Sequence, residues 1–535
     1  MCGIAVAISW AGAEEAVRRL IEGVRHRGDV ADPIVLPLPD YAMGTQRLRI
    51  VDGARAVQPQ ASFDGEILVS FNGEIYNHRE LRRELEAAGV AFRTDSDTEV
   101  LASALRLWGP KALRRINGMY AFVAVDVANG EFLAARDPLG VKPLYLIQSA
   151  TGFLFCSEIR PLLGACETGD VLLLPPGHFM TRAALGKFGG FIADQATPRI
   201  AHEPAVLDRL LRDAVQIRVP PDLPAAILFS GGVDSTLVAH YAREIRPETP
   251  GYFLGDDDAP DYDYAARYAD ATGFDLRRVT MDQDGDGLLA QIDAVVNTAE
   301  SFEPSMIRDG LCNHHLARRI HRDGYRVALC GEGADELFAG YAPLELAFAD
   351  GETAGRNLRE QALSLMHRTN LQRLDRFGMR FLVELREPFL DPAVIGYALS
   401  LPASEMLTHT EEGVRGKAPL RSLWTLHREA LPTAIRDRRK LAMHVGSGFD
   451  KSQKRSPWID FAEQSVSDAA LADGKRRFAR FDLQTKEEYL YLDRLAATLD
   501  VFRVPHLTAR PFLKMPRLKS GSKAEEALSD FLLAS

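Results

Sequence analysis

The feature that most constrains the fold of this chain is an apolar run that passes through two glycines into a helical pattern. The run reads Ala225-Ala-Ile-Leu-Phe-Ser230-Gly231-Gly232-Val233-Asp234-Ser235, and it predicts a strand over residues 225–229 and a helix over residues 235–243. The glycines let backbone amides approach a phosphate, and the N-terminus of the helix adds partial positive charge. We therefore expect this loop to hold pyrophosphate. A strand-to-helix turn without a ligand is the alternative, and the lysine and spacing of a Walker P-loop are missing.

A second strand, predicted over residues 325–329, ends in another acidic loop, Cys330-Gly331-Glu332-Gly333-Ala334-Asp335-Glu336. Strands and helices alternate in this part of the chain, which predicts a parallel α/β sheet. Active sites of such sheets form at the carboxyl ends of the strands, so Asp234 and Asp335 could share a magnesium ion bound to triphosphate. Further along, Lys440 either reaches phosphate oxygens or belongs to a solvated basic turn.

The chain has 535 residues, too many for one hydrophobic core, and we expect two domains. Short β-type runs dominate residues 2–185, with helices predicted at 79–88 and 98–107. Glycine, proline and polar residues then mark residues 186–204 as a linker. The second domain, residues 205–535, begins with a predicted helix at 205–217 and the α/β pattern, and it becomes mostly helical after about residue 355.

Composition excludes several classes of function. A formal net charge of -10, with no compensating basic cluster, argues against nucleic-acid binding and favours small-molecule partners. Five cysteines without CxxC pairing predict neither disulfides nor a zinc site. Residues 282–287 copy the start of an EF-hand loop, but Asp293 stands where the usual glutamate is needed, so we expect no calcium there. No apolar run approaches the ~20 residues of a membrane span, and we expect a soluble, cytoplasmic protein.

Cysteine is the second residue, in Met1-Cys2-Gly3-Ile4. Removal of Met1 would leave the thiol of Cys2 beside a free α-amine that titrates near pH ~8 and can take the thiol's proton during attack on a carbonyl. An ordinary small penultimate residue is the alternative.

Taken in order along the chain, these motifs resemble those of glutamine-dependent asparagine synthetases. The glutaminase signatures of that family are matched at residues 2–4, 26–28, 46–52, 71–77 and 96–99, and a further family segment at 136–145. The synthetase signatures are matched at residues 230–235, 330–341 and 388–391. The resemblance covers almost the whole chain. It implies an N-terminal nucleophile hydrolase, an αββα sandwich of the type-2 glutamine amidotransferase kind, over residues 2–185. For residues 205–535 it implies a parallel-sheet ATP pyrophosphatase (PP-loop) domain with a largely helical C-terminal part.

The resemblance also assigns roles in the first domain. Cys2 would attack the side-chain amide of glutamine and release ammonia, with the Asn72 side chain and Gly73 amide as the oxyanion hole. Arg47 would hold the α-carboxylate of glutamine, while Glu74 and Asp97 would bind its α-ammonium. A surface ion pair for Arg47 and a helix cap for Asp97 are the alternatives.

In the second domain the resemblance implies that ATP activates a carboxylate as an acyl-adenylate, which ammonia then attacks. Glu332 and Glu384 would lie near the acyl centre, where either could accept the proton that ammonia loses. Ammonia would travel between the two sites through an intramolecular tunnel, and a homodimer is plausible. The residues expected to bind the nucleotide are Phe229, Ser230, Gly231, Gly232, Asp234, Ser235, Leu254, Cys330, Gly331 and Lys440, with Mg²⁺ on Asp234 and Asp335.

The acceptor region departs from the family pattern. Ser305 and Arg308 would bind the acceptor, and a retained arginine suits a carboxylate, but Met306 and Gly310 stand where the family usually has hydroxyl residues. Aspartate is the leading acceptor, and the same chemistry on another carboxylate in a specialised pathway is the alternative. β-Lactam synthetases usually have tyrosine in place of Glu332, so Glu332 favours attack by external ammonia. A non-catalytic protein that retains the fold is a further alternative, although the complete set of candidate residues argues against it.

Overall fold

The computed structural model describes residues 2–53, 55–189, 202–281, 287–411, 413–450 and 456–508. These residues form two compact units. The first contains residues 2–189 together with Met379–Leu382 and Ala496–Leu507, and the second contains the rest. Most of the predicted linker, residues 190–201, and the EF-hand-like residues 282–286 lie outside the described residues.

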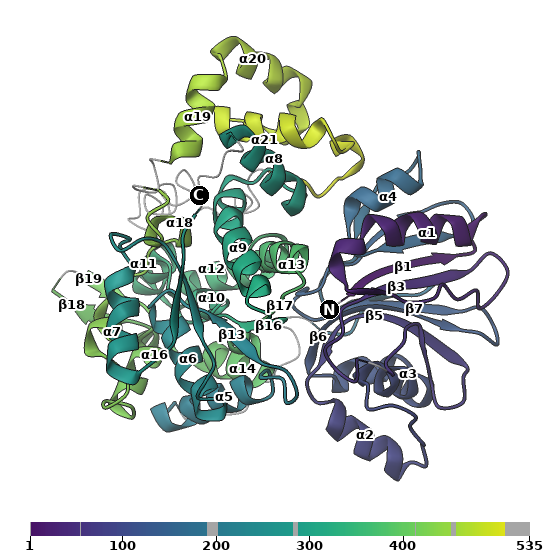
Figure 1. Cartoon of the computed structure of the whole chain (residues 1–535), viewed down its shortest axis with the longest axis horizontal. Helices are drawn as coiled ribbons and strands as arrows, with labels where there is room; N and C mark the ends of the chain where they lie inside the picture. Colours follow the sequence, from purple (N-terminus) through teal and green to yellow (C-terminus); the bar gives the residue numbers. More distant parts are fainter. Residues whose placement is uncertain are drawn as a thin grey trace. The chain divides into compact units, whose positions relative to one another are not determined.

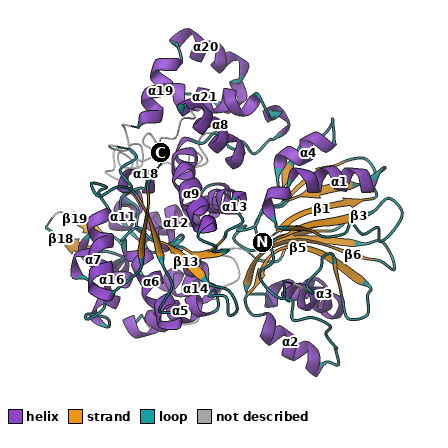
Figure 2. Cartoon of the chain, in the orientation of Figure 1, coloured by secondary structure: helices purple, strands orange, loops and turns teal. Residues whose placement is uncertain are grey.

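The first unit contains two six-stranded antiparallel sheets. Helices α1 (Ala13–Gly23) and α4 (Ile159–Ala165) cover one sheet, and α2 (His78–Ala87) and α3 (Asp97–Trp108) cover the other (Figures 1 and 2). One sheet has the strand order β10-β8-β9-β1-β3-β2, and the other has the order β12-β11-β7-β6-β5-β4. The strands are β1 (Cys2–Ile8), β2 (Val30–Ala31), β3 (Ala42–Arg47), β4 (Gln60–Ala61), β5 (Ile67–Ile75), β6 (Gly118–Asp126), β7 (Phe132–Arg136), β8 (Tyr145–Gln148), β9 (Phe153–Cys156), β10 (Leu172–Leu173), β11 (His178–Met180) and β12 (Leu185–Lys187). The unit is therefore an αββα sandwich, as predicted.

Alternation along the strands places the first candidate site between the two sheets. In β1, Cys2 and Ile4 point into the apolar layer that the sheets share. In β5, Val69 and Phe71 pack on the other side of their sheet, in the core that includes residues of α2 and α3. Because successive side chains of a strand point to opposite faces, Asn72 faces the first sheet, where β1 begins.

The two helices predicted in this unit are observed as α2 and α3, and Ser96 caps α3 by accepting a hydrogen bond from the backbone nitrogen of Thr98 at 3.1 Å. The sequence analysis missed α1 and α4. Helix α1 buries a stripe of apolar residues with helical spacing and pairs Glu14 with Arg18 across one turn, at 2.6 Å.

The second unit is built on a five-stranded sheet in which every neighbouring pair is parallel, with the order β15-β14-β13-β16-β17. Its strands are β13 (Ala225–Leu228), β14 (Gly251–Leu254), β15 (Leu276–Val279), β16 (Val327–Leu329) and β17 (Glu384–Arg386). Helix α5 (Pro204–Gln216) precedes β13, and the helices between β13 and β16 are α6 (Val233–Ile245), α7 (Tyr262–Thr272), α8 (Leu288–Ala299) and α9 (Pro304–Arg322). The central strand β13 continues to β14 on one side, while its other neighbour is β16. A crevice at the carboxyl ends of these strands is where open α/β sheets bind ligands.

After β16 the chain is mostly helical, in agreement with the prediction of helices after about residue 355. The helices are α10 (Ala334–Leu337), α11 (Ala342–Asp350), α12 (Glu352–Leu365), α13 (Asn370–Arg380), α14 (Pro392–Ser400), α15 (Ala403–Met406), α16 (Ala418–Ser422), α17 (Thr433–Asp437), α18 (Met443–Gly446), α19 (Pro457–Ser465), α20 (Asp468–Arg477) and α21 (Lys486–Ala496). A small hairpin of β18 (Thr408–Thr410) and β19 (Gly413–Arg415) interrupts them.

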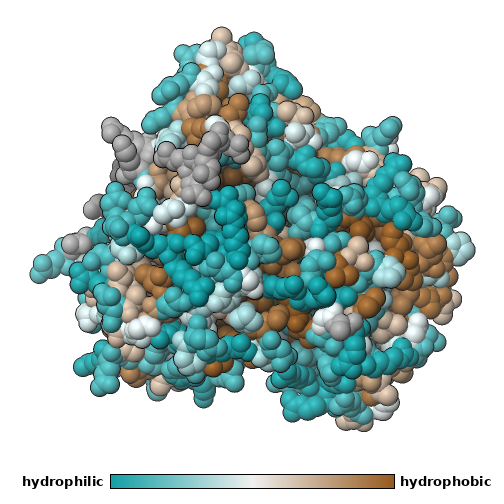
Figure 3. Space-filling model, in the orientation of Figure 1, coloured by the Kyte–Doolittle hydropathy of each residue, from teal (hydrophilic) through white to brown (hydrophobic). Residues whose placement is uncertain are grey.

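Hydrophilic residues cover much of the face shown in Figure 3, with apolar patches between them. Within the described part of the chain, every helix is too short or too polar to cross a bilayer.

Candidate active sites

The first candidate site surrounds the thiol of Cys2. Cys2 is only 5% exposed, and its main-chain nitrogen donates a 2.9 Å hydrogen bond to Oδ1 of Asn72. Burial raises the pKa of the Cys2 thiol. The thiol therefore needs a base when it reacts, and removal of Met1 would turn the hydrogen-bonded nitrogen into such a base.

The side-chain amide of Asn72 contributes a hydrogen-bond donor beside Cys2. Oδ1 of Asn72 accepts from Cys2, and the remaining donor, Nδ2, is buried without a hydrogen-bond partner. The next residue, Gly73, runs so close to β6 that a Cβ atom would lie 2.2 Å from the carbonyl oxygen of Met119. Only glycine fits this position. A buried donor without a partner is costly, and it suits a site where a negative oxygen develops.

Four of the five predicted glutamine-binding residues line one small cavity together with Cys2, and Asn72 is not part of that lining. Cys2, Arg47, Gly73, Glu74 and Asp97 surround a volume of about 30 Å³. The carboxylate of Asp97 is anchored, because its Oδ2 accepts a 3.0 Å hydrogen bond from the backbone nitrogen of Ile75.

The guanidinium of Arg47 has a partner that the sequence analysis missed. Its Nε and Nη2 form a fork on the carboxylate of Asp32, at 2.7 and 3.0 Å, and its Nη1 donates to the carbonyl of Gly53 at 2.8 Å. Asp32 lies four residues after Gly28 and outside the segments that match the family signatures, so the sequence offered no motif for it. The paired Asp32 orients Arg47, which borders the cavity.

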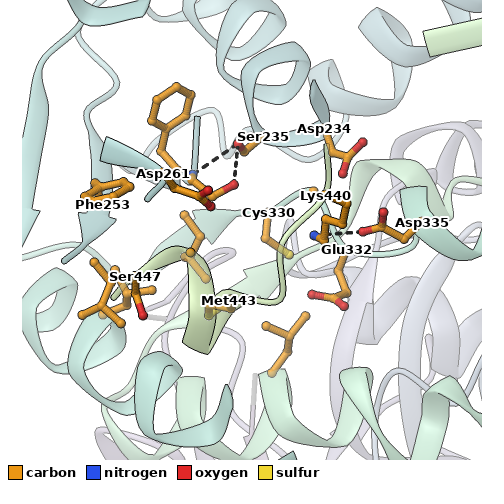
Figure 4. Close-up of a pocket in the computed structure, with 18 residues that line it drawn as sticks. Asp234, Ser235, Phe253, Asp261, Cys330, Glu332, Asp335, Lys440, Met443 and Ser447 are labelled. Atoms are coloured by element: carbon orange, nitrogen blue, oxygen red, sulfur yellow. Dashed lines mark hydrogen bonds and ion pairs between the residues drawn. The ribbon is translucent and has the colours of Figure 1, made fainter. Parts of the chain in front are cut away.

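The second candidate site lies at the carboxyl ends of β13, β14 and β16 (Figure 4). The glycine-rich loop turns there because Gly231 adopts a positive φ of 64°, and a Cβ at this residue would lie 2.5 Å from the backbone nitrogen of Ala265. Within the loop, Ser235 Oγ accepts a 3.2 Å hydrogen bond from the backbone nitrogen of Ser230. Gly331 is equally restricted, since its Cβ would lie 2.8 Å from that of Asp234.

A pocket of about 100 Å³ occupies this site. In Figure 4, Phe253 and Ser447 lie at one end, and Lys440, Asp335 and Glu332 lie at the other. The predicted nucleotide residues that line it are Phe229, Ser230, Asp234, Ser235, Leu254, Cys330, Gly331 and Lys440. Gly232 lines an adjoining cavity of about 420 Å³ that shares Asp234 and Lys440 with the pocket. Asp261, which also lines both cavities, was not predicted; it pairs with Arg438.

Lys417 is the most important residue that the sequence analysis missed. Its Nζ lies 2.5 Å from Oδ2 of Asp234 and 2.5 Å from Oδ1 of Asp335, and Lys440 Nζ lies 3.0 Å from the other oxygen of Asp335. Burial opposes the ionisation of Asp335, but the two ammonium groups outweigh it and hold the pKa of this carboxyl at about 2.

The carboxylates of Asp234 and Asp335, the predicted magnesium ligands, lie close together, since both contact Lys417 Nζ. Oδ1 of Asp234 is buried without a hydrogen-bond partner. Within the described ranges, no group of three or more His, Cys, Asp or Glu side chains could hold a metal ion alone. Two carboxylates nevertheless fit Mg²⁺, which is commonly held by one or two carboxylates together with substrate phosphates and water.

The two carboxylates predicted near the acyl centre lie in different places. Glu332 lines the pocket, and it accepts hydrogen bonds from Asn370 at 2.5 Å and Arg373 at 3.3 Å. Glu384 begins β17, in register with Val327 at the start of β16, and its Oε1 accepts a 2.7 Å hydrogen bond from Arg386. Because the pocket lies at the opposite ends of these parallel strands, Glu384 is not brought to it.

The predicted acceptor residues on α9 also lie away from the lining of the pocket. Ser305 donates to the carboxylate of Glu303 at 2.8 Å. Arg308 is 2% exposed and lies 3.5 Å from Asp450 and 3.4 Å from Glu487. The side chain of Arg308 is thus surrounded by carboxylates from the C-terminal helical part, which no local pattern around residue 308 could predict.

Together the two sites define a class of protein, an amidotransferase with an N-terminal nucleophile joined to an α/β synthetase unit. Comparison with known proteins agrees. Residues 1–172 match the family model described as a glutamine amidotransferase domain, and residues 206–363 and 348–503 match the one described as asparagine synthase. The chain belongs to the family of glutamine-hydrolysing asparagine synthetases, and it is an enzyme of the carbon–nitrogen ligase type.

Individual relatives span nearly the whole chain. Asparagine synthetase [glutamine-hydrolyzing] 1 of Arabidopsis thaliana is 31% identical over 519 residues, which cover 92% of this chain and 85% of the relative. The enzymes of Brassica oleracea and Asparagus officinalis are each 30% identical over 516 residues, covering 92% of this chain and 85% and 84% of the relatives. Among solved structures, the glutamine phosphoribosylpyrophosphate amidotransferase of B. subtilis aligns with a TM-score of 0.30 and 19% identity, over 48% of this chain and 67% of that one; a score this low carries no argument.

Proposed function

We propose that this enzyme hydrolyses glutamine at Cys2 and joins the released ammonia to a carboxylate that it activates with ATP. The observation that carries the proposal is the cavity in which Cys2, Gly73, Glu74 and Asp97 meet, in a chain whose second unit carries the phosphate-loop pocket. A thiol site that releases ammonia and a pocket suited to a nucleotide are the two parts that such a ligase needs.

In the first step, the α-amine of processed Cys2 takes the proton of the thiol, and sulfur attacks the side-chain carbonyl carbon of glutamine. The carbonyl oxygen becomes negative, and Asn72 Nδ2 and the Gly73 amide donate to it. The C–N bond then breaks, the nitrogen receives the proton and leaves as ammonia, and water hydrolyses the thioester to glutamate. The buried Asn72 donor without a partner supports this role.

In the second step, a carboxylate oxygen attacks the α-phosphorus of ATP and pyrophosphate leaves. Phe253 and Ser447 would border the adenine base of ATP, and the loop from Ser230 to Ser235 would hold its phosphates. Lys417 and Lys440 would neutralise the charge that grows on the leaving pyrophosphate, which their contacts with Asp234 and Asp335 support. Magnesium held by Asp234 and Asp335 would supply further charge neutralisation when bound.

In the last step, ammonia attacks the acyl carbon, AMP leaves, and the nitrogen loses a proton. We propose Glu332 as the group that accepts this proton, because it lines the pocket beside Lys440 (Figure 4). Its position supports Glu332 over Glu384, which lies at the other end of its strand.

Aspartate is the first acceptor to test, since the relatives are named for making asparagine. A different carboxylate is the second candidate. It is favoured by one observation, the placement of Arg308 among Asp450 and Glu487 and outside the pocket lining.

The test is pyrophosphate release from ATP with ammonium chloride and a panel of carboxylates that includes aspartate, glutamate and monocarboxylates without an amino group. Release that depends on aspartate supports asparagine synthesis. Release driven by another carboxylate alone favours the second candidate, and no carboxylate-dependent release from ATP overturns the ligase proposal.

A further inference from the structure

A chain of buried charged residues connects the acyl end of the pocket with the segment that follows Lys440. Arg373, on α13, donates from Nη2 to Glu332 at 3.3 Å and from Nη1 to Asp309 at 2.8 Å. Asp309, on α9, lies 2.7 Å from Nδ1 of His444 and accepts a 3.2 Å hydrogen bond from the backbone nitrogen of the same residue. His444 belongs to α18, which begins three residues after Lys440.

These four linked side chains are shielded from water. Arg373 and His444 are buried, and the side chains of Glu332 and Asp309 are each 15% exposed. Burial opposes the ionisation of Asp309, but His444 and Arg373 outweigh it and lower the pKa of this carboxyl. Asp309 is therefore held as a charged link between Arg373 and His444.

The Lys440 segment is attached on both sides. Before Lys440, Arg438 pairs with Asp261. Arg438 also donates to the carbonyl of Ser230 at 3.1 Å, in the glycine-rich loop of residues 230–235, called here the phosphate loop. After Lys440, His444 is held by Asp309. The first attachment connects the segment to the phosphate loop, and the second connects it to Glu332 through Arg373.

We propose that Asp309 and Arg373 are positioning residues. They hold Glu332 and the segment around Lys440, residues 438–444, in fixed positions relative to each other. This inference rests on the proposed roles of Glu332 at the acyl centre and Lys440 at the phosphates. Asp309, Arg373 and His444 do not line the pocket, so they act through the groups that they hold. Glu332 and Lys440 must both be in place at the same time, since displacement of a reacting group by ~1 Å can lower a rate ~100-fold.

The inference predicts that variants along the chain are not independent. Arg373→Gln and His444→Gln should each lower kcat for ammonia-dependent amide synthesis by roughly 30- to 100-fold, with much smaller changes in KM for ATP. The double variant should be no more than about 3-fold slower than the worse single variant, because either change interrupts the same row of contacts from Glu332 to His444. Asp309→Asn, which keeps the shape of the side chain, should give a loss of the same size.

Arg376→Gln is the matched control. Arg376 lies one turn further along α13 and is also a buried arginine, with a 2.7 Å contact to Glu300. It should tolerate substitution with kcat within about 3-fold of the parent enzyme. Arg373→Lys should recover only part of the rate, since an ammonium cannot reproduce the planar fork of a guanidinium.

The experiment measures pyrophosphate release with ATP, ammonium chloride and the carboxylate that the panel identifies. Thermal unfolding of each variant reports intact folding of the second unit, and glutamate release, measured in parallel, reports that the first unit is unaffected. Losses that multiply in Arg373→Gln/His444→Gln, or full activity in Asp309→Asn, overturn the inference. Parent enzyme that releases no pyrophosphate with any carboxylate rejects instead the proposed function, and the inference with it.

Discussion

The main-chain nitrogen of Cys2 donates a 2.9 Å hydrogen bond to Oδ1 of Asn72, which ties the first residue of β1 to β5 in the opposite sheet. This bond fixes the amide of Asn72, so that its Nδ2 is the free donor in the layer between the sheets. One side chain thereby holds the main-chain nitrogen of Cys2 and presents a donor where we propose that the oxyanion forms.

Asn72→Ala removes both contacts. We expect glutaminase kcat to fall by about 10²–10³-fold, the usual effect of losing one oxyanion-hole donor, while synthesis from ammonium chloride persists. Glutamate release and ammonia-dependent pyrophosphate release check the two parts separately. Asn77→Ala is the control, because Asn77 hydrogen-bonds Asn117 and the carbonyl of Arg115 at the end of the same segment and lies outside the cavity lining. Equal glutaminase loss in both variants would contradict the assignment.

Lys417→Met leaves the carboxylates of Asp234 and Asp335 without the ammonium that they share. We expect ammonia-dependent pyrophosphate release to fall by at least ~100-fold and the second unit to lose about 3 kcal/mol of stability, because the buried Asp234 carboxylate loses its ammonium partner and Asp335 keeps only Lys440.

The matched control for Lys417 is Lys486→Met. Lys486 also bridges two carboxylates, lying 2.9 Å from Asp468 and 3.3 Å from Glu463, but at the surface of α19 to α21. Its substitution should change activity by less than about 2-fold. Steady-state kinetics decide: a Lys417→Met enzyme with parental pyrophosphate release would remove Lys417 from the phosphate site.

Glu303 gives the second unit a pH-dependent stability. Glu303 caps α9 by accepting from the backbone nitrogens of Ser305 and Met306, and burial raises the pKa of its carboxyl to about 7, although these hydrogen bonds oppose the shift. A raised pKa means that the folded protein binds the proton more tightly than the unfolded chain does. Its contribution to stability is therefore complete below the unfolded pKa of ~4.3 and is lost as the pH rises to about 7.

Glu303→Gln stays neutral at every pH, so the variant should gain about 2–3 kcal/mol relative to the parent between pH 5 and pH 8. Thermal unfolding midpoints of both proteins at the two pH values measure this difference. Glu352→Gln, at an exposed helix start, should show no such trend. A gap between parent and Glu303→Gln that is the same at pH 5 and pH 8 would show that Glu303 is not the titrating group.

The sequence predicted those parts of the site that depend on neighbours in the chain. The loop after β13 and the acidic loop after β16 are recognisable because an apolar run, glycines and carboxylates follow one another within a dozen residues. Lys417 was missed because it meets Asp234 across 183 positions of sequence. Asp32 and the Arg373–Asp309 contact were missed for the same reason, since long-range packing alone brings them together.

Arg308 illustrates the opposite case. An arginine on α9 that matches the family pattern predicted a carboxylate ligand, yet Asp450 and Glu487, far along the chain, contact its side chain. Helix α1 was missed for a different reason: its apolar stripe has helical spacing, but the sequence analysis assigned the whole region to short strands.

The central claim is that Cys2 supplies ammonia to a synthetase site that works independently of it. Cys2→Ala protein, assayed for amide synthesis with glutamine and separately with ammonium chloride, tests this claim most directly. The account predicts that glutamine-dependent synthesis is lost, by at least ~10³-fold, while ammonia-dependent synthesis stays within about 2-fold of the parent enzyme. Loss of both activities, or retention of glutamine-dependent synthesis, would contradict it.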